Sequence, residues 1–520
     1  MNSGFPWITA ITALPLLGGF IVIGLEPSRA RLARGLSLAI SLAALAMVLA
    51  ITALFDGSSG ALQFERRHDW ITALGVQYFV AIDGLGLVML LLTAIVVPMA
   101  MLASRNIRDR VPMYHSLVLF LQAGLFGTFT ALNFFHWFLF WELSLIPAFF
   151  LIRLWGGHER AAAANQFFIY TMVGSIALLL SFLALFLATG MFDFIELAKL
   201  AREGKIIPAL ANSVGWHDLT VRKLAVVVFA GAFLGFAVKV PLMPFHSWLP
   251  GTYTQASIGT TMLLTGVMSK MGVYGFLRIL LPIFQQEMRW IAPVLLWLAV
   301  ITIVFSAGAA FAQRDMKRLL AYSSINHLGY CLLGIFAVVN VTSGAPGNSV
   351  VDKAAALNGV ILQMFNHGLT AATLFWFVGM IEERTNGACG LSEFGGLRKV
   401  APVFCGLMGI SLFSSLGLPG LNGFIGEFLI FRGAFPLATW AAALSALGLL
   451  ITAIFILTLI QKVFWGPLNE RWSRFPDLTL TERCLLGPPI ALMFLIGIYP
   501  QVLVGLFNQS ALGMARFFTW

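Results

Sequence analysis

Four ionisable side chains lie deep inside long apolar stretches of the sequence. Glu142 stands in FWELSLIP, Lys239 in FAVKVPLMPFHSWLP, Lys270 in MSKMGVYG and Glu427 in GFIGEF. A charged group at the centre of a bilayer costs about 2.5–3.5 kcal/mol, so the four together cost on the order of 10 kcal/mol before any pairing. Each of them therefore needs a partner, water or a function.

These residue types are suited to proton transfer. A buried carboxylate and a buried ammonium can pass a proton between them when water enters or leaves, and we expect Glu142 and Lys239 to form such a couple. Lys270 would be the next proton-carrying group in the series, and Glu427 the last. The alternative is an ion pair that only locks helices together, but locking does not require four buried charges.

Three histidines extend this series because histidine titrates near neutral pH. His246 follows the run of prolines, His327 lies in AYSSINHLG and His367 in MFNHG. Each of them serves equally well as a relay or as an ordinary hydrogen-bonding residue. The other histidines fall near the ends of apolar runs or in loops and are expected to be structural: His68, His115, His136, His158 and His217.

The composition identifies the elements that must position these side chains. Of the 520 residues, 59 % are apolar and only 10 % are charged, against roughly 25 % charged in soluble domains. About fourteen apolar runs are long enough to cross a bilayer, which predicts an all-α membrane protein. They are 5–25, 32–55, 80–104, 112–132, 134–154, 165–190, 223–249, 255–281, 290–311, 317–340, 354–381, 402–432, 436–464 and 482–508.

The net charge of +10 is explained by the orientation of the chain in the membrane and not by nucleic-acid binding. More than half of the 32 Lys and Arg residues lie in the loops after runs 1, 3, 5, 9, 11 and 13. The positive-inside rule places those loops in the cytoplasm and both termini on the periplasmic side of a multi-pass membrane protein.

Two of the runs are interrupted by helix-breaking residues. Run 7 contains Pro241, Pro244 and Pro250, and run 12 contains Pro419 flanked by glycines. Breaks that lie five runs apart indicate two inverted repeats around an ion site, although chance is the alternative. The predicted units are a three-helix region at 1–111, repeats at 112–281 and 290–464, and a C-terminal helix at 465–520.

No motif for redox chemistry or metal binding is found. The four cysteines are scattered without a C-x-x-C pair, and the sequence has neither a dinucleotide-binding glycine motif nor a P-loop. We therefore expect no cofactor and no metal in this chain.

Longer motifs carry a resemblance to a known family. FAVKVPLMPFHSWLP, LLTGVMSKMGVYGFLRI, QRDMKRLLAYSSINHLGY and LPGLNGFIGEFLIFRG resemble the antiporter-like subunits of respiratory complex I over roughly residues 80–435. FWELSLIPAFFLIRLWGG and AIDGLGL add to the match. The glutamate in run 12 favours the chain M group, whose organellar relatives are subunit 4 and the plastid-type D subunit, because other groups usually have lysine there.

The resemblance implies fourteen helices, two inverted five-helix repeats and broken helices 7 and 12. It implies proton translocation in a bacterial inner membrane, as one subunit of an NADH–quinone oxidoreductase beside other membrane-arm subunits. NADH, FMN, iron–sulfur clusters and quinone would be bound in other subunits. The matching site residues are the couple Glu142 and Lys239, the central Lys270, the terminal Glu427, and the connecting His246, His327 and His367.

One stretch departs from the family pattern. The sequence GTYTQAS places Tyr253 and Gln255 where histidine and glutamate are often found. This removes a titratable pair at the cytoplasmic end of run 8 and puts any uptake route through that pair in doubt. Two alternatives stay open: a subunit of a multisubunit Na⁺/H⁺ antiporter or membrane-bound hydrogenase, and a scaffold that has the fold but conducts nothing.

Overall fold

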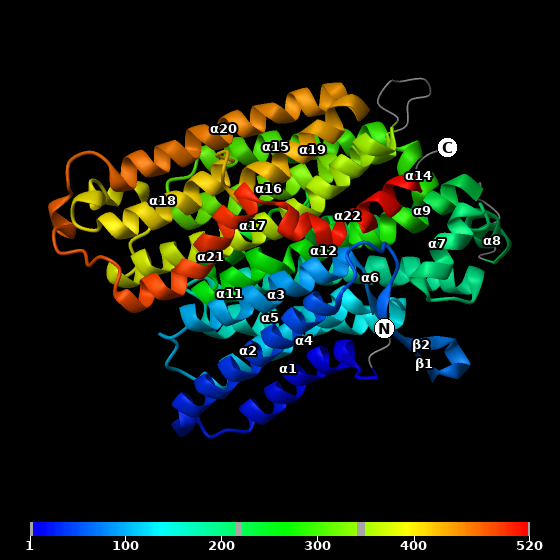
Figure 1. Cartoon of the computed structure of the whole chain (residues 1–520), viewed down its shortest axis with the longest axis horizontal. Coiled ribbons are helices and arrows are strands. Elements are labelled where there is room, and N and C mark those ends of the chain that lie inside the picture. Colours follow the sequence, from blue (N-terminus) through cyan, green and yellow to red (C-terminus); the bar gives the residue numbers. More distant parts are fainter. Residues whose placement is uncertain (1–3, 214–220, 341–348, 518–520) are drawn as a thin grey trace.

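The chain forms a bundle of long helices that run roughly along its longest dimension (Figure 1). The structure, a computed structural model, describes residues 4–213, 221–340 and 349–517. Helix α1 begins and helix α22 ends at the end of the bundle that also contains β1, β2, α7 and α8 (Figure 1). The loops near 105–110, 156–159 and 465–479 lie at the opposite end.

The main helices are, in chain order, α1 (Trp7–Ile23), α2 (Ala30–Leu54), α3 (Gly84–Ala103), α4 (Val111–Thr130), α5 (Phe134–Trp155), α6 (Arg160–Thr189), α7 (Phe194–Arg202), α8 (Ile206–Ser213), α9 (Val221–Lys239), α10 (Trp248–Gln255), α11 (Ile258–Leu263), α12 (Lys270–Gly275), α13 (Leu281–Ile283), α14 (Gln285–Trp290), α15 (Ala292–Phe311), α16 (Met316–Val339), α17 (Val350–Arg384), α18 (Pro402–Leu416), α19 (Asn422–Leu437), α20 (Thr439–Phe464), α21 (Leu480–Ile498) and α22 (Gln501–Arg516). Short 3₁₀ turns are η1 (Pro27–Arg29), η2 (Thr72–Leu74), η5 (Leu391–Glu393), η6 (Leu397–Lys399) and η7 (Glu470–Trp472).

The helices confirm an all-α membrane protein. Within the described residues, ten helices are long and apolar enough to cross a membrane, and α1 and α18 are shorter apolar helices. Helices also occupy the predicted runs 4, 7 and 12, as α4, α9 and the pair α18–α19. The number of fourteen membrane crossings stays a prediction, because these elements are short, interrupted or less apolar.

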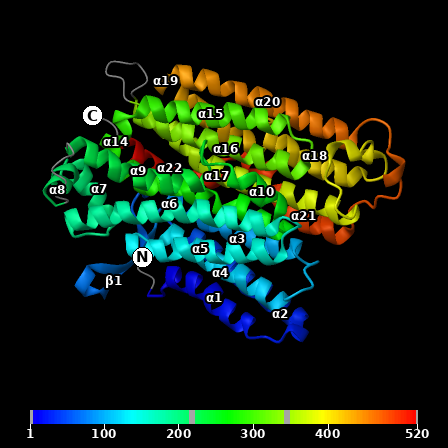
Figure 2. The ribbon, with the colours of Figure 1, turned by 180° about the vertical axis from the view of Figure 1, so that it is seen from behind.

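The core of the bundle is formed by four spans. In the most apolar stretch of each of these spans, the fraction of residues that are buried is 100 % for α17, 94 % for α16, 94 % for Ile258–Ile283 and 89 % for α3. The same fraction is only 33 % for α20 and 28 % for the span of α2. Both views place α1 and α20 on opposite outer faces with α17 between them (Figures 1 and 2). Polar side chains on the four inner spans therefore face other helices and not lipid.

The two predicted helix breaks are present. Helix α9 ends at Lys239, and α10 begins only at Trp248, after a stretch of turns that contains Pro241 and Pro244. Helix α18 ends at Leu416, and α19 begins at Asn422. Proline has no N–H to donate and clashes with the preceding turn, which accounts for both breaks. Each break thus has a buried ionisable residue close by, Lys239 in one case and Glu427 in the other.

The span Ile258–Ile283 is continuous but irregular. Two π-helical turns, η3 (Leu264–Met268) and η4 (Phe276–Leu280), flank α12. A π turn adds a residue to the helical turn and redirects the side chains that follow, and such turns are frequent at functional sites. The first of them lies directly before Lys270.

Three features differ from the fourteen predicted runs. A two-stranded antiparallel sheet, β1 (Gln63–Ile71) with β2 (Val76–Ile82), precedes α3. Helices α7 and α8 lie between α6 and α9. The last apolar run is divided into α21 and α22 at Tyr499–Pro500, because proline interrupts the helix.

Candidate functional site

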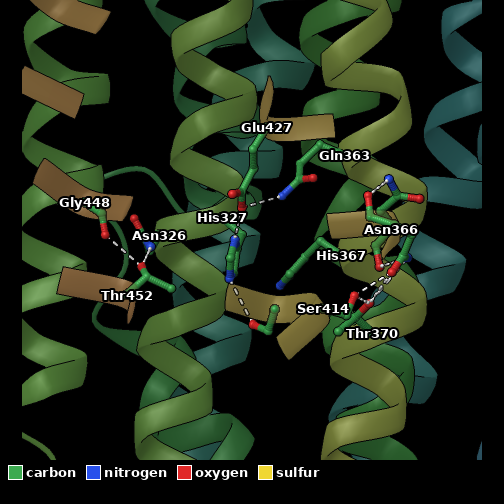
Figure 3. A network of polar contacts seen from close by, with 12 residues as sticks. Asn326, His327, Gln363, Asn366, His367, Thr370, Ser414, Glu427, Gly448 and Thr452 are labelled. Atoms are coloured by element: carbon green, nitrogen blue, oxygen red, sulfur yellow. Dashed lines mark hydrogen bonds and ion pairs between the residues drawn. The ribbon is translucent and has the colours of Figure 1, made fainter. Parts of the chain in front are cut away.

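Four of the predicted side chains lie in one buried row contributed by four different helices. Lys270 Nζ of α12 is 2.8 Å from His367 Nδ1 of α17. His327 Nδ1 of α16 is 2.9 Å from Glu427 Oε1 of α19, and the two imidazole rings between them have centroids 5.1 Å apart. The exposed fraction is 0 % for Lys270, 3 % for His327, 6 % for His367 and 5 % for Glu427. The row therefore joins a buried base to a buried acid through two titratable rings. Figure 3 shows its members His367, His327 and Glu427.

The Lys270 end of the row is held by the π turn that precedes it. Besides His367, Lys270 Nζ donates to the carbonyl of Thr265 and lies 3.4 Å from Ser269 Oγ. Thr265 Oγ1 in turn lies 3.1 Å from Ser324 Oγ of α16. These neutral partners satisfy the donors of the amine without neutralising its charge.

The Glu427 end contains partners that the sequence analysis did not identify. Gln363 Nε2 donates to Glu427 Oε1 at 3.2 Å, and His327 Nε2 lies 3.2 Å from Ser415 Oγ. With both ring nitrogens of His327 engaged, the ring is held between a carboxylate and a hydroxyl. The sequence signal that could have identified Gln363 is its position in ILQMFNHG, inside an apolar run. A polar amide buried in such a run needs a hydrogen-bond partner.

A small cavity of about 10 Å³ is lined by both imidazole side chains and by residues at the break between α18 and α19. His327, His367 and Glu427 line it together with Ser414, Ser415 and four further residues. A space of roughly this size accommodates one water molecule when several polar groups surround it. The ring-to-ring step in the row therefore has room for a bridging water.

A second set of polar contacts fixes the shape of that break. Asn366 Nδ2 donates to the carbonyl of Asn422 at 2.6 Å, and Ser414 Oγ donates to Asn422 Oδ1 at 2.5 Å. Thr370 Oγ1 lies 3.1 Å from Ser414 Oγ. These bonds tie α17 and α18 to the first residue of α19, the helix that carries Glu427, and part of this network is drawn in Figure 3.

Glu142 and Lys239 are arranged differently. Lys239 is 3 % exposed, and neither its Nζ nor Glu142 Oε1 has a hydrogen-bond partner among the described residues. The ammonium lies over the ring of Trp141, 4.8 Å from its centroid. The charge of Glu142 still acts on Lys239 through space, but the ion pairs found within the described residues do not include this couple.

The Lys239 region adjoins the Lys270 region through a close backbone contact. Gly272 lies so near the break that a Cβ there would come within 2.9 Å of the nitrogen of Val240, the residue after Lys239. His246 is half-buried in the same break, with its ring centroid 6.5 Å from that of Tyr322. Its Nδ1 has no hydrogen-bond partner in the described part of the chain. The structure thus brings His246 near α16 but does not bond it to the row.

The remaining histidines lie away from the row. His115 and His136 are buried in α4 and α5, whereas His68 and His158 are exposed. His217 lies outside the described residues. Over the ranges 4–213, 221–340 and 349–517, no group of three or more His, Cys, Asp or Glu side chains is placed to hold a metal ion.

A buried ion pair anchors the span that carries Lys270. Arg278 of η4 forms an ion pair with Asp83, whose carboxylate also accepts from the N–H of Gly86 at 3.1 Å and so caps α3. Arg278 Nε additionally lies 3.3 Å from Tyr274 Oη. Fold and site together define a polytopic helical membrane protein with a buried, hydrogen-bonded row of ionisable groups, an arrangement suited to moving ions.

Comparison with known proteins identifies the family. Residues 131–454 match the family described as "NADH:quinone oxidoreductase/Mrp antiporter, TM". NADH-quinone oxidoreductase subunit M of Rhodobacter capsulatus is 32 % identical over 508 residues, which cover 97 % of this chain and 95 % of the relative. NAD(P)H-quinone oxidoreductase chain 4 1 of Synechococcus elongatus is 34 % identical over 526 residues, covering 99 % and 92 %. The chain belongs to this family.

Solved structures show the same fold. A chain of respiratory complex I from Thermus thermophilus with bound NADH superposes with a TM-score of 0.82 at 27 % identity, covering 98 % of this chain and 99 % of that one. A chain of the Mrp complex from Dietzia sp. has a TM-score of 0.82 at 20 % identity, covering 99 % of both chains. The second likeness concerns the fold alone.

Proposed function

We propose that this chain is a proton-translocating membrane-arm subunit of an NADH–quinone oxidoreductase-type complex. The observation that carries the proposal is the buried row Lys270–His367–His327–Glu427, whose neighbouring groups lie within 2.8–2.9 Å at both ends. Two relatives, at 32 % and 34 % identity, are subunits of NADH- and NAD(P)H-quinone oxidoreductases, and this chain aligns with nearly their whole length. This similarity supports the assignment to such a complex.

The row moves a proton by a sequence of short transfers. A proton on Lys270 passes to His367, then through a water in the small cavity to His327, and finally to Glu427. Because the groups are buried, the charge on one of them strongly biases the protonation of the next. Glu142 and Lys239 form the neighbouring part of the axis, and water or side-chain movement connects them to the row with His246 beside the break.

The redox chemistry takes place in other subunits of the complex. In this proposal NADH, FMN, iron–sulfur clusters and quinone are bound by those subunits, and this chain takes part in the enzyme by translocating protons. Its partners are neighbouring antiporter-like and other membrane-arm subunits. A change of charge in a neighbouring subunit would act electrostatically on Glu142 or Glu427 and start proton transfer along the row.

The proposal includes an orientation and an internal symmetry. The concentration of basic loops at one end of the bundle supports placing that end in the cytoplasm and the termini in the periplasm of a bacterial inner membrane. The breaks after α9 and α18, each with a buried ionisable residue close by, support the two inverted repeats at 112–281 and 290–464. The segments 1–111 and 465–520 flank these repeats.

Substitution of Lys270 in the assembled complex tests the function. Lys270→Met keeps the length of the side chain but removes the base from the row. The number of protons pumped per electron, measured in reconstituted vesicles, should fall by the whole contribution of this subunit. Lys462→Met, at an exposed lysine in the last turn of α20, is the matched control and should pump normally. An unchanged stoichiometry in Lys270→Met would count against the proposal.

A multisubunit Na⁺/H⁺ antiporter or a membrane-bound hydrogenase is the second candidate, supported by the fold shared with the Mrp complex. The two candidates differ in what accompanies the chain. Purification in mild detergent together with NADH- and iron–sulfur-binding subunits supports the first. Purification with small antiporter subunits alone, and Na⁺ transport without electron transfer, supports the second.

A further inference from the structure

The proposed row does not account for one fully buried tyrosine. Tyr253 of α10 is 0 % exposed, and its hydroxyl has no hydrogen-bond partner among the residues that the structure describes. The hydroxyl faces the side chains of Thr265 and Ser269, and Ser269 Oγ lies 3.4 Å from Lys270 Nζ. A buried hydroxyl that is left unpaired is unfavourable, so its position beside Ser269, the residue before Lys270, calls for an explanation.

The ring of Tyr253 is held in a fixed position. It packs edge-on against Phe375 of α17 at a centroid distance of 5.9 Å. The carbonyl of Tyr253 accepts from Thr261 Oγ1 of α11 at 3.1 Å. Helix α17 thus contacts the ring of Tyr253, and α11 holds its backbone.

A cavity of about 290 Å³ opens near the same helices, at the end of the bundle where α3 and α17 finish. Its lining includes Ser104, Ser257, Gly259, Glu382 and Glu383. Glu382 accepts from Lys317 Nζ at 2.6 Å, and Glu383 is exposed. The cavity is large enough for several water molecules, and the carboxylates at its rim can collect protons from solvent.

Hydroxyl groups lead inward from this cavity. Tyr114 Oη lies 2.8 Å from Ser104 Oγ and 3.3 Å from Ser257 Oγ, and Ser257 Oγ lies 2.8 Å from Thr260 Oγ1. Gly259 allows this approach, because a Cβ there would come within 1.9 Å of Ser104 Oγ. Ser257 precedes α11 and Thr260 lies in its first turn, and α11 directly follows α10, the helix of Tyr253. The cavity and Tyr253 are thus connected through one short segment of chain.

We infer that Tyr253 passes protons from the Glu382–Glu383 cavity to Lys270, as the uptake step of this chain. The inference rests on the proposed function. Tyr253 Oη gives its proton to the Ser269 hydroxyl while Ser269 gives its own to the neutral amine of Lys270. A water between Thr260 and Tyr253, supplied from the cavity, returns a proton to the tyrosine. The net change is one proton moved from the cavity to Lys270, with both hydroxyls regenerated.

Removing the hydroxyl of Tyr253 tests this step. Tyr253→Phe leaves the ring and its packing on Phe375 in place, so assembly of the complex should be unchanged. Proton pumping coupled to quinone reduction should slow by about tenfold or more, as expected when a positioned proton carrier is lost. The control is Tyr78→Phe, which removes a tyrosine hydroxyl from β2. Strand β2 lies at the end of the bundle opposite the cavity (Figure 1), so this variant should pump as the unaltered complex does.

A second variant separates proton transfer from packing. Tyr253→His keeps a side chain that carries a proton and should recover at least half of the rate lost in Tyr253→Phe. If Tyr253→Phe pumps normally, the inference is overturned, and the proposed function still stands when Lys270→Met abolishes pumping. If the Phe and His variants are equally slow, Tyr253 has a packing role only and the inference is also overturned.

Discussion

The two ionisable regions of the molecule differ in how their members are connected. Around Glu427, neighbouring groups are bonded at 2.9–3.2 Å and both nitrogens of His327 are engaged. Around Lys239, the ammonium lies over the face of Trp141 at 4.8 Å without a hydrogen-bond partner among the described residues, and Glu142 acts on it through space. Both regions adjoin a broken helix, so the breaks alone do not determine the difference.

The difference indicates a division of roles along the axis. A row that is hydrogen-bonded at both ends transfers protons with little rearrangement, since only the step between the two imidazole rings needs a bridging water. A couple without a direct bond needs water or side-chain movement before it transfers anything. We therefore propose that the Glu142–Lys239 region regulates transfer by its charge state and that the Lys270–Glu427 region conducts.

The largest expected effect comes from breaking the connected row. His367 is the side chain that joins Lys270 to His327 in the described structure, so His367→Phe should lower the pumping rate by about 100-fold or more. His246→Phe is the matched change in the other region. Because His246 is not bonded to the row, it should reduce the rate by only about twofold to fivefold. Equal losses in both variants, measured as proton uptake by reconstituted vesicles, would remove the distinction between the regions.

A smaller effect, on stability, is expected from breaking the ion pair between Asp83 and Arg278, which anchors the span that carries Lys270. Asp83→Asn leaves Arg278 buried without its carboxylate, and breaking one partner of a buried pair costs about 3–5 kcal/mol. Thermal unfolding of the detergent-solubilised complex should begin at a lower temperature. Asp69→Asn, on the exposed strand β1, is the control and should leave unfolding unchanged. A midpoint that does not move in Asp83→Asn would show that the pair contributes little.

The smallest expected effect is a dependence of stability on pH at the start of α18. Burial alone would raise the pKa of Asp477, but hydrogen bonds from the N–H groups of Leu478, Phe404 and Val403 outweigh it and hold that pKa below its usual 3.8. Its stabilising contribution is therefore complete above about pH 4 and is lost as the pH falls through the lowered pKa. Removal of such a cap costs about 1 kcal/mol.

Asp477→Asn tests this sign directly. The variant should be less stable than the unaltered protein at pH 7, and the two should converge as the pH approaches 3, when thermal unfolding is compared in detergent. Asp56→Asn, in an exposed loop, is the matched control. A stability difference that grows toward acid pH would contradict the assignment of Asp477 as a cap.

Much of the fold could be predicted because each apolar run is a local property of the chain. The breaks at Pro241, Pro244 and Pro419 were also readable, since proline acts within one helical turn. The hairpin β1–β2 and helices α7 and α8 were not predicted, because short elements outside the membrane have weak periodic signals. The π turn before Lys270 has no clear sequence signal, because it depends on packing against α3, α16 and α17.

The ionisable groups that enter the membrane could be identified from the amino-acid sequence, because the cost of burying a charge makes Glu142, Lys239, Lys270 and Glu427 conspicuous in apolar runs. Which of these groups contact one another became known from the folded structure. Lys270 and His367 are 97 positions apart, and His327 and Glu427 are 100 apart. Contacts at such separations depend on how helices rotate and slide against one another, which no local pattern specifies. The same packing placed Gln363 on Glu427 and the ring of Tyr253 on Phe375.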